Sequence, residues 1–381
     1  MERQIFSEEH ERFRDAFARF CDSEIVPYQA QWEKDGVVPR SLWRKAGQAG
    51  FLCPCLPEEL GGAGADFLYS VVMIEELARA RANGPAFSVH SDICAPYLYR
   101  YGSEAQHQRW LPAAASGEKI LAIAMTEPDA GSDLAGIRTT AKRAGDGYVI
   151  NGQKTFISNG QLCDLVIVVA RTDPDADPAY TGISLFVVED GTPGFEKGRA
   201  LEKMGMKAQD TSELSFSDCY VSKEQLLGEE GMGFYYLMEN LQQERLVVAI
   251  ACARGAEQVL DDGVRYCRER KAFGKPLSKL QHLQFRLVEI ATEVELARTF
   301  VDRLVTEHAA GNSIVREVSM AKWWVSEMLK RTCDEVLQFH GGYGYIMEYP
   351  IARDFLDARI QTIFAGTTEI MKLIIAKQMG L

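Results

Sequence analysis

The chain has 381 residues, of which 46% are hydrophobic and 25% are charged, as in an ordinary globular protein. That length accommodates two or three domains, each with a core of its own. The formal net charge of -12 argues against nucleic acid or an anionic membrane as the main partner.

The nine cysteines are scattered and odd in number, so they do not form a disulfide framework. Cys53-Pro54-Cys55 is the one close pair, and without an H-E-x-x-H pair of ligands we predict no metal site. Reduced thiols indicate a cytoplasmic setting. Segment 1–11 resembles neither a signal sequence nor an Arg-rich transit peptide, so a mitochondrial matrix location would require a transit peptide already removed. No apolar run approaches membrane-spanning length, so no membrane insertion is expected.

Residues 1–118 read as an N-terminal helical domain. Helices are predicted around 13–20 and 71–80, and Ser103 with Gln106 is typical of a capping box at the start of a third helix. The glycine-rich stretch 61–64 lacks both a preceding strand and the Lys-Ser/Thr ending of a phosphate loop, so we interpret it as a turn.

Residues 119–228 read as strands. Apolar runs at 120–125, 165–170 and 183–188 are separated by turn residues, and Asn151-Gly152 between two short strands predicts a two-residue hairpin. No stretch between these strands is long enough for a crossover helix, so we expect an antiparallel barrel or sandwich. No G-x-G-x-x-G follows a strand, which counts against a nicotinamide-binding domain.

Residues 229–381 are predicted to be helical. Long periodic segments cover 234–270, 279–310 and 313–339, and a last helical pair follows the glycine-rich break at 340–344. Three long helices and a shorter one predict a four-helix bundle. The expected fold is therefore α+β, with a helical domain, a middle β domain and a C-terminal bundle.

One carboxylate lies on the buried face of the first long helix. Apolar residues recur at helical spacing from Leu237 to Val259, and Glu244 lies on the same stripe, three residues after Leu241. A buried carboxylate must be paired or have a raised pKa. Pattern alone leaves two interpretations open, a structural pair with the adjacent Arg245 or a general base in a dry pocket.

Four stretches carry unusual chemistry for a core or a loop, namely 125–133, 270–274, 338–344 and 364–370. In this order, across a helix-strand-helix plan, they resemble the acyl-CoA dehydrogenase family over essentially the whole chain. Gln243-Glu244-Arg245-Leu246 and the stretch 347–352 most resemble its long-chain branch.

The resemblance implies a tightly bound FAD, because no side chain can accept a hydride. In the family, the loop from Met125 through Thr126 and Gly131 to Ser132, and the strand residues Phe156, Ile157 and Ser158, line the flavin ring. The rest of the cofactor is held at positions matching Arg270, Phe273, Gln281, Gln338, Phe339, His340, Gly341, Gly342, Thr367, Thr368 and Glu369. In relatives several of these, including Arg270 and the Gln338 loop, reach the flavin of a neighbouring subunit, so a homotetramer or homodimer is implied.

The position of the catalytic base separates branches of the family. Many relatives carry a glutamate immediately before the Gly-Thr of the last motif, where this chain has Ala365. In the long-chain and isovaleryl branches the base lies on the earlier helix, at the position matching Glu244. Glu244 is therefore expected to be the base, and the backbone N–H of Ala365 to bind the thioester carbonyl. Acyl-CoA contacts are expected at Ser132, Tyr235, Gln242, Gln243, Arg245, Ala365 and Gly366.

The implied reaction oxidises a saturated acyl-CoA, of medium to long chain, to a trans-2-enoyl-CoA. Electrons would pass to an electron-transferring flavoprotein. Gly84-Pro85 resembles the long-chain branch and is expected to leave room at the pocket base. Three alternatives stay open on the same scaffold: a short, branched or pathway-specific acyl substrate, a flavin-dependent oxidase, and a non-catalytic acyl-CoA binding protein.

Overall fold

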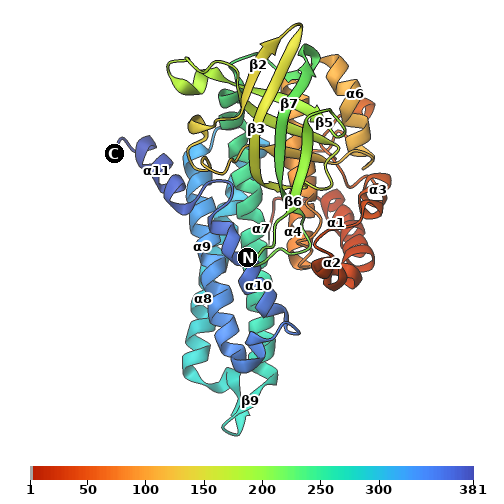
Figure 1. Ribbon diagram of the computed structural model, residues 1–381. Helices are drawn as coiled ribbons and strands as arrows, with labels where there is room; N and C mark the ends of the chain where they lie inside the picture. The colour runs from red at the N-terminus through yellow and green to blue at the C-terminus, as the bar shows by residue number, and fades with distance from the viewer. Residues whose placement is uncertain (1–2) are drawn as a thin grey trace.

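The computed structural model describes residues 3–381. A helical region, a β region and a second helical region follow one another in the predicted order (Figure 1). The N-terminal helices are α1 (Glu8–Phe20), α2 (Gln29–Asp35), α3 (Arg40–Gln48), α4 (Phe67–Arg79), α5 (Ala95–Tyr101) and α6 (Glu104–Ala115). The expected capping box is confirmed, because the Ser103 hydroxyl accepts from the Gln106 N–H and the Gln106 side chain accepts from the Ser103 N–H. Residues 61–64 form a turn, also as predicted.

The middle region is one eight-stranded sheet in the order β6-β7-β3-β2-β4-β5-β8, with β1 added alongside β4. Its strands are β1 (Leu121–Ala124), β2 (Thr140–Ala144), β3 (Gly147–Ser158), β4 (Leu165–Arg171), β5 (Ile183–Glu189), β6 (Phe195–Ala200), β7 (Thr211–Ser222) and β8 (Leu226–Leu227). The sheet is not closed into a barrel. It is also not fully antiparallel, because β4 pairs in parallel with both β1 and β2.

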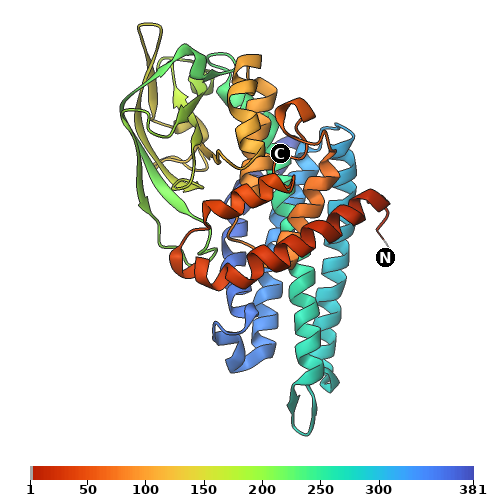
Figure 2. The same ribbon diagram turned by 90° about the vertical axis from the view of Figure 1, so that its right-hand side faces the viewer.

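Both faces of the central strands are covered, which explains their continuous apolar runs. One face of β4 and β5, including Leu165 and Leu185, packs on Trp110 of α6 and on Tyr97 of α5. The other face packs inside the curved sheet, against residues such as Phe216 of β7. Figure 2 shows the orange helices α5 and α6 between the sheet and the rest of the molecule.

The predicted hairpin at Asn151-Gly152 is wrong, because β3 runs unbroken through this dipeptide. A β-bulge on the partner strand lies opposite it: Asp218 has a φ of +49°, and its N–H donates to the Asn151 side-chain oxygen over 2.9 Å. Gly152 is required for space, since a Cβ there would come within 2.7 Å of the Thr139 Cα. The true hairpin joins β2 to β3, where Ala144 pairs with Gly147.

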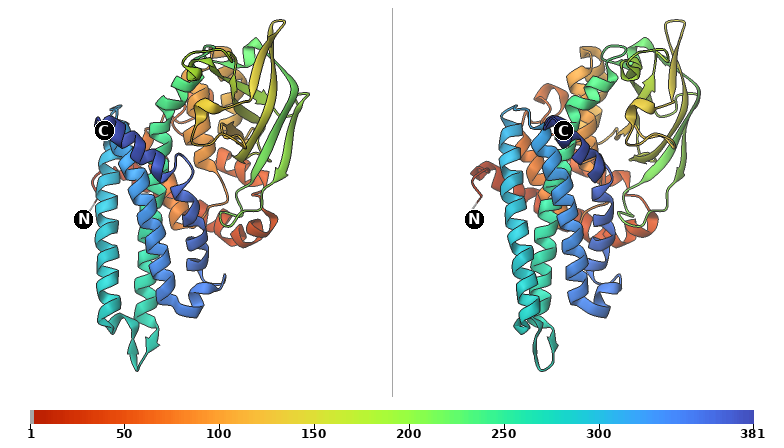
Figure 3. Two further views of the ribbon diagram at one scale, coloured as in Figure 1. Left: turned by 60° about the vertical axis from the view of Figure 1, so that its left-hand side comes forward. Right: turned by 90° about the vertical axis from the view of Figure 1, so that its left-hand side faces the viewer.

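The C-terminal region is the predicted helical bundle. Its helices are α7 (Gly233–Glu269), α8 (Gln281–Ala309), α9 (Val315–His340), α10 (Pro350–Ala358) and α11 (Thr368–Gln378), with a small ribbon of β9 (Lys271–Ala272) and β10 (Lys275–Pro276) between α7 and α8. Figure 3 shows the three long helices side by side, with the ribbon at the end farthest from the sheet. At 1.5 Å per residue α7 is about 55 Å long and extends from the sheet to that end.

In the range 3–381 no helix combines the length and apolar character needed to cross a bilayer. Over the same range no three His, Cys, Asp or Glu side chains lie close enough together to hold a metal ion. The nine cysteines are free thiols, eight of them buried.

The bulge gives a prediction for stability. Gly152→Ala should lower the free energy of unfolding by about 2–3 kcal/mol, because the added methyl group overpacks against Thr139. Gly145→Ala is the matched control: its φ is +61° with nothing within 4 Å of the new Cβ, so only the backbone cost of about 1 kcal/mol applies. Thermal unfolding of both variants measures the difference, and equal losses would contradict the close approach of Thr139.

Candidate functional site

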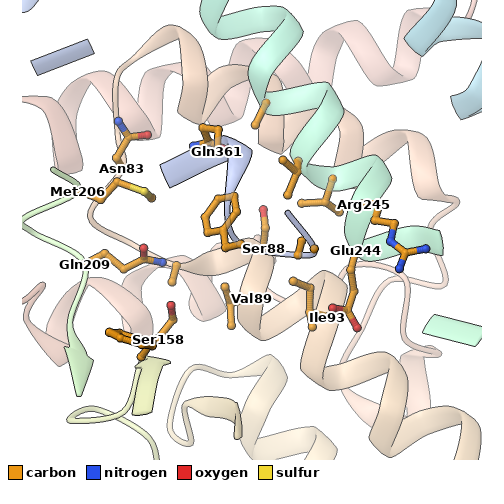
Figure 4. Close-up of a pocket in the computed structure, with 18 of the residues that line it drawn as sticks. Asn83, Ser88, Val89, Ile93, Ser158, Met206, Gln209, Glu244, Arg245 and Gln361 are labelled. Carbon is orange, nitrogen blue, oxygen red and sulfur yellow. The ribbon is translucent and has the colours of Figure 1, made fainter. Parts of the chain in front are cut away.

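A cavity of about 570 Å³ lies where the three regions meet. Its walls come from α4, the π-helical turn Val89–Cys94, the 125–135 loop, the end of β3, α7, α9, α10 and the 361–366 turn. In Figure 4, Glu244 and Arg245 of α7 lie on one side of the cavity, and Asn83, Met206 and Ser158 on the other. Residues from distant parts of the sequence thus share one enclosed space.

Glu244 lines this cavity and is only 5% exposed, as the apolar stripe of its helix predicted. Tyr97 of α5 donates its hydroxyl proton to Glu244 Oε1 over 2.8 Å. Burial raises the pKa of the Glu244 carboxyl to about 7, although the Tyr97 hydrogen bond and the charge of Arg245 oppose that rise. Glu244 is therefore a carboxylate whose proton exchanges near neutral pH.

Arg245 does not form the structural pair with Glu244 that the sequence left open. Within residues 3–381 the Arg245 side chain has no ion pair or hydrogen bond, and its buried Nε has no partner. The residue is 5% exposed and lines the same cavity. Burial lowers the pKa of its guanidinium, and the Glu244 charge partly offsets this. A buried cation without a partner, next to a cavity, favours an electron-rich ligand group.

The turn between α10 and α11 brings backbone donors to the cavity. Ala365 has a φ of +52°, which is unusual for a residue with a side chain, and Gly366 follows at +96°. Both residues line the cavity, with Phe364 beside them. No acceptor within the described chain takes a hydrogen bond from the Ala365 N–H. This N–H is thus free to bind an oxygen of a ligand.

A second bulge turns an aromatic ring out at the end of β3. The register between β3 and β7 shifts between Lys154 and Ile157, and Phe156 within this shift has a φ of +59°. Its ring is 67% exposed and lines the cavity, together with Ile157 and Ser158. Bulges beside binding sites commonly re-aim a side chain in this way.

The 125–133 loop is clamped by two residues that sequence reasoning missed. Lys154 of β3 is fully buried and donates to the Met125 carbonyl over 3.0 Å and to Glu127 Oε1 over 2.8 Å. Glu127 also accepts from the Arg138 and Thr139 N–H groups. The next residue of β3, Thr155, donates its N–H to the Thr126 carbonyl. These bonds hold Met125, Thr126, Gly131 and Ser132 at the cavity wall.

A second cavity of about 440 Å³ lies at the far end of the bundle. It is lined by Tyr266, Arg270, Leu277, the predicted residues Gln338, Phe339, His340, Gly341 and Gly342, and also Tyr343 and Ile346. Phe273 in the nearby ribbon is 93% exposed, and Gln281 at the start of α8 is also exposed. Along α7, Glu244 and the last helical residue before Arg270 are about 38 Å apart.

Some predicted contact residues lie outside both cavities. Gln242 bonds to His308 and to the Ile314 N–H, and Gln243 donates to the Asp92 carbonyl, so both brace α7. Tyr235 lies on the surface against Tyr180. Thr367 caps α11 through the Ile370 N–H. Thr368 is buried and donates to Glu327, and Glu369 is exposed in the first turn of α11.

All three regions of the chain match one family. Residues 7–118 match the N-terminal domain of acyl-CoA dehydrogenases, 122–219 the middle domain and 231–380 the C-terminal domain. The chain belongs to the acyl-CoA dehydrogenase family. Members of this family are flavoprotein oxidoreductases that act on CH–CH bonds, so the recognition from motifs is confirmed.

Relatives within the acyl-CoA dehydrogenase family differ in substrate length. The long-chain specific acyl-CoA dehydrogenase of Rattus norvegicus mitochondria is 48% identical over 376 residues, covering 99% of this chain and 87% of the relative. The short-chain specific enzyme of the same organism is 38% identical over 370 residues, covering 97% and 89%. A crystal structure of an acyl-CoA dehydrogenase from Geobacillus kaustophilus covers both chains completely with a TM-score of 0.99 and 55% identity.

The buried carboxylate gives a prediction that does not depend on activity. The folded-state pKa of Glu244, about 7, is above its unfolded value of 4.5, so ionisation costs stability. Below pH 4.5 the stability difference between Glu244→Gln and wild type should not change with pH. As the pH rises from 4.5 to about 7, the variant should gain stability relative to wild type, because only wild type has this carboxyl to ionise. Above about pH 7 the difference should again be constant. The gain should reach roughly 3 kcal/mol.

Urea or thermal unfolding between pH 4.5 and 8.5 measures this gain. Glu269→Gln, at the exposed end of the same helix, is the matched control, because it makes the same substitution where the side chain is solvated. A stability difference between Glu244→Gln and wild type that does not change with pH would contradict the raised pKa of Glu244.

Proposed function

We propose that the protein is an FAD-dependent dehydrogenase of long, straight-chain acyl-CoA, forming the trans-2-enoyl-CoA. The observation that carries this proposal is that a buried carboxylate, Glu244, and a free backbone N–H, at Ala365, line one cavity. One can remove a proton from carbon and the other can stabilise the oxygen on which negative charge develops.

The walls opposite these groups fit a flavin. Phe156 presents an exposed ring on a strained bulge, a suitable surface for a planar heterocycle. The clamped loop offers the Thr126 and Ser132 side chains beside Gly131, where the backbone is open to close approach, and Ser158 adds a hydroxyl. FAD, when bound there, would supply the hydride acceptor that side chains cannot provide.

Glu244 is the proposed base for the α-proton of the thioester. Its burial excludes water and raises its basicity, and Tyr97 holds the carboxylate in one orientation. Ala365 occupies the position where many relatives carry the base, yet its side chain cannot take a proton. Its N–H is unaffected by the loss of the carboxylate and can bind the thioester oxygen. The unpartnered Arg245 adds positive potential to the same region.

The shape of the cavity favours a long acyl chain. On α7 the lining residues Glu244, Val248, Ala251, Gly255 and Gln258 follow one face of the helix. Glu244 and Gln258 are about 21 Å apart along the axis. With C–C bonds of roughly 1.5 Å in a zigzag, an extended chain advances roughly 1.3 Å per carbon, so this length accommodates about 16 carbons.

Charged residues close the far end of this channel. Arg81 pairs with Asp354 over 2.8 Å and also with Asp262, and Asn83 donates to Asp357. Arg81, Asn83, Asp354 and Asp357 also line the cavity. Because breaking this ion network to admit more methylene groups is unfavourable, it is expected to limit chain length.

Assembly is part of the same proposal. The end of α7 that borders the second cavity is about 38 Å along the helix from Glu244, and so lies far from a flavin bound beside Glu244. The second cavity is therefore proposed to hold the distal part of an FAD bound mainly by a neighbouring copy, with Arg270 suited to its pyrophosphate and Phe273 and Gln281 at the contact. This implies a homotetramer or homodimer. An electron-transferring flavoprotein is the proposed electron acceptor, and the cytoplasm the proposed location.

Glu244→Gln tests the proposed base. The variant should retain FAD and acyl-CoA binding, because it keeps the shape and the Tyr97 contact, but lose at least 1,000-fold in turnover. Anaerobic mixing with palmitoyl-CoA, followed by flavin absorbance in a stopped-flow instrument, measures this. Bleaching of the variant flavin at the wild-type rate would contradict the assignment. A wild-type flavin that never bleaches would instead indicate a non-catalytic binding protein.

Gly255 tests the chain-length proposal. Gly255→Leu should narrow the channel about 16 Å along the helix from Glu244 and lower kcat/KM for palmitoyl-CoA at least 10-fold, while octanoyl-CoA stays within about threefold. Gly255→Ala is the matched control, since its Cβ would lie 3.7 Å from Leu329, an ordinary contact. A panel of saturated acyl-CoAs from four to eighteen carbons with an artificial acceptor measures both. Equal losses for all lengths would contradict this path.

A further inference from the structure

A buried lysine contacts the turn that carries the free Ala365 N–H. Lys322 of α9 is completely buried, and its Nζ donates to the Gly366 carbonyl over 2.6 Å. This is its one hydrogen bond within residues 3–381. Neither the sequence motifs nor the proposed function assigns a role to Lys322.

The turn needs such an anchor because its backbone is strained. A residue with a Cβ in the left-handed region costs about 1 kcal/mol or more, and Ala365 is such a residue, at a φ of +52°. Gly366 follows at a φ of +96°, in the left-handed region that favours glycine. On the other side of the turn, Thr368 is tied to Glu327, also on α9. One helix thus holds the turn at two points.

Charge at the lysine is compatible with this role. Burial lowers the pKa of Lys322 to about 8, so the ammonium form still predominates at neutral pH. The charge of Arg245 on α7 disfavours the ammonium form of Lys322, whereas the charges of Glu327 and Glu369 favour it. The Cys252 thiol of α7 also lies near Lys322. A charge-assisted hydrogen bond is about twice as strong as a neutral one.

We propose that Lys322 is a positioning residue for the dehydrogenation: its ammonium group fixes the Gly366 carbonyl and thereby keeps the Ala365 N–H directed at the thioester oxygen. The proposal rests on the proposed function, because it assigns Lys322 an effect on α-proton removal. Small displacements of a donor matter at such a site, where a shift of 1 Å can cost on the order of 100-fold in rate.

Lys322→Met tests this, because methionine keeps most of the volume and lacks the donor. The probe is a 3-thia-acyl-CoA, in which sulfur replaces the β-carbon so that no hydride can leave while the α-protons remain removable. In the flavin-loaded enzyme in D₂O, mass spectrometry measures the rate of α-proton exchange. We expect Lys322→Met to lower both this rate and kcat 10- to 100-fold, with KM within about threefold and FAD content unchanged.

Two further variants separate positioning from a general effect on folding. Ser319→Ala removes a fully buried hydroxyl that bonds within α9, one turn before Lys322, and should leave the exchange rate within twofold of wild type. Lys322→Gln, whose stem is one bond too short to reach Gly366, should reproduce the slow exchange, and it replaces Lys322→Met if that variant does not hold FAD.

Several outcomes would overturn the proposal. Exchange within twofold of wild type in the lysine variants that hold FAD would do so, as would a loss of activity in both variants that is explained entirely by lost FAD. If wild type itself neither exchanged α-protons nor reduced its flavin with palmitoyl-CoA, the proposed function would fail, and the role of Lys322 with it.

Discussion

The burial of one carboxylate organises the site. Glu244 is on the core-facing stripe of α7, where an ionised group is stable only if its surroundings offset the loss of water. The structure offers a single hydroxyl from Tyr97 and the nearby but unbonded charge of Arg245. That support is too weak to hold the pKa at its ordinary value and strong enough to fix the orientation of the side chain. A base that is ready near pH 7 is the physical result.

The rest of the fold places partners around this carboxylate. The N-terminal region contributes Tyr97 and the channel wall, the sheet contributes the Phe156 bulge and the loop held by Lys154, and α9 holds the Ala365 turn. These segments are far apart in the sequence and meet only because α7 spans the molecule from the sheet to the distal ribbon. Phe156 and Ala365, two of the cavity residues with a left-handed backbone, lie at the two walls proposed to contact cofactor and substrate.

Much of this was predictable because it depends on local pattern. The bounds of α7 and the burial of Glu244 follow from helical periodicity, and the capping box at Ser103 follows from residue type and spacing. The failure at Asn151-Gly152 has a tertiary cause: the dipeptide has the turn chemistry of a hairpin, but the glycine is there because Thr139 approaches it. Whether a side chain would fit at position 152 depends on the distant Thr139, so it cannot be inferred from the residues next to Gly152 in the sequence.

The contacts that complete the site were not predictable. Tyr97 and Glu244 are 147 positions apart, and Lys322 and Gly366 are 44 apart. No spacing rule links such pairs, since their distance is set by how helices pack. The same holds for Gln242 and Gln243, which the motif resemblance assigned to ligand contacts. In the structure Gln242 bonds to His308 and Gln243 to the Asp92 carbonyl.

The pH dependence of kcat/KM for palmitoyl-CoA tests the central claim most directly, because it reports the pKa of the base in the free enzyme. The base acts when ionised, so activity should rise with pH along a limb centred near 7. Removing the Tyr97 donor in Tyr97→Phe destabilises the carboxylate and should move the limb upward by about one pH unit. A profile that is flat from pH 5.5 to 8.5, or a limb that moves downward in the variant, would contradict the account.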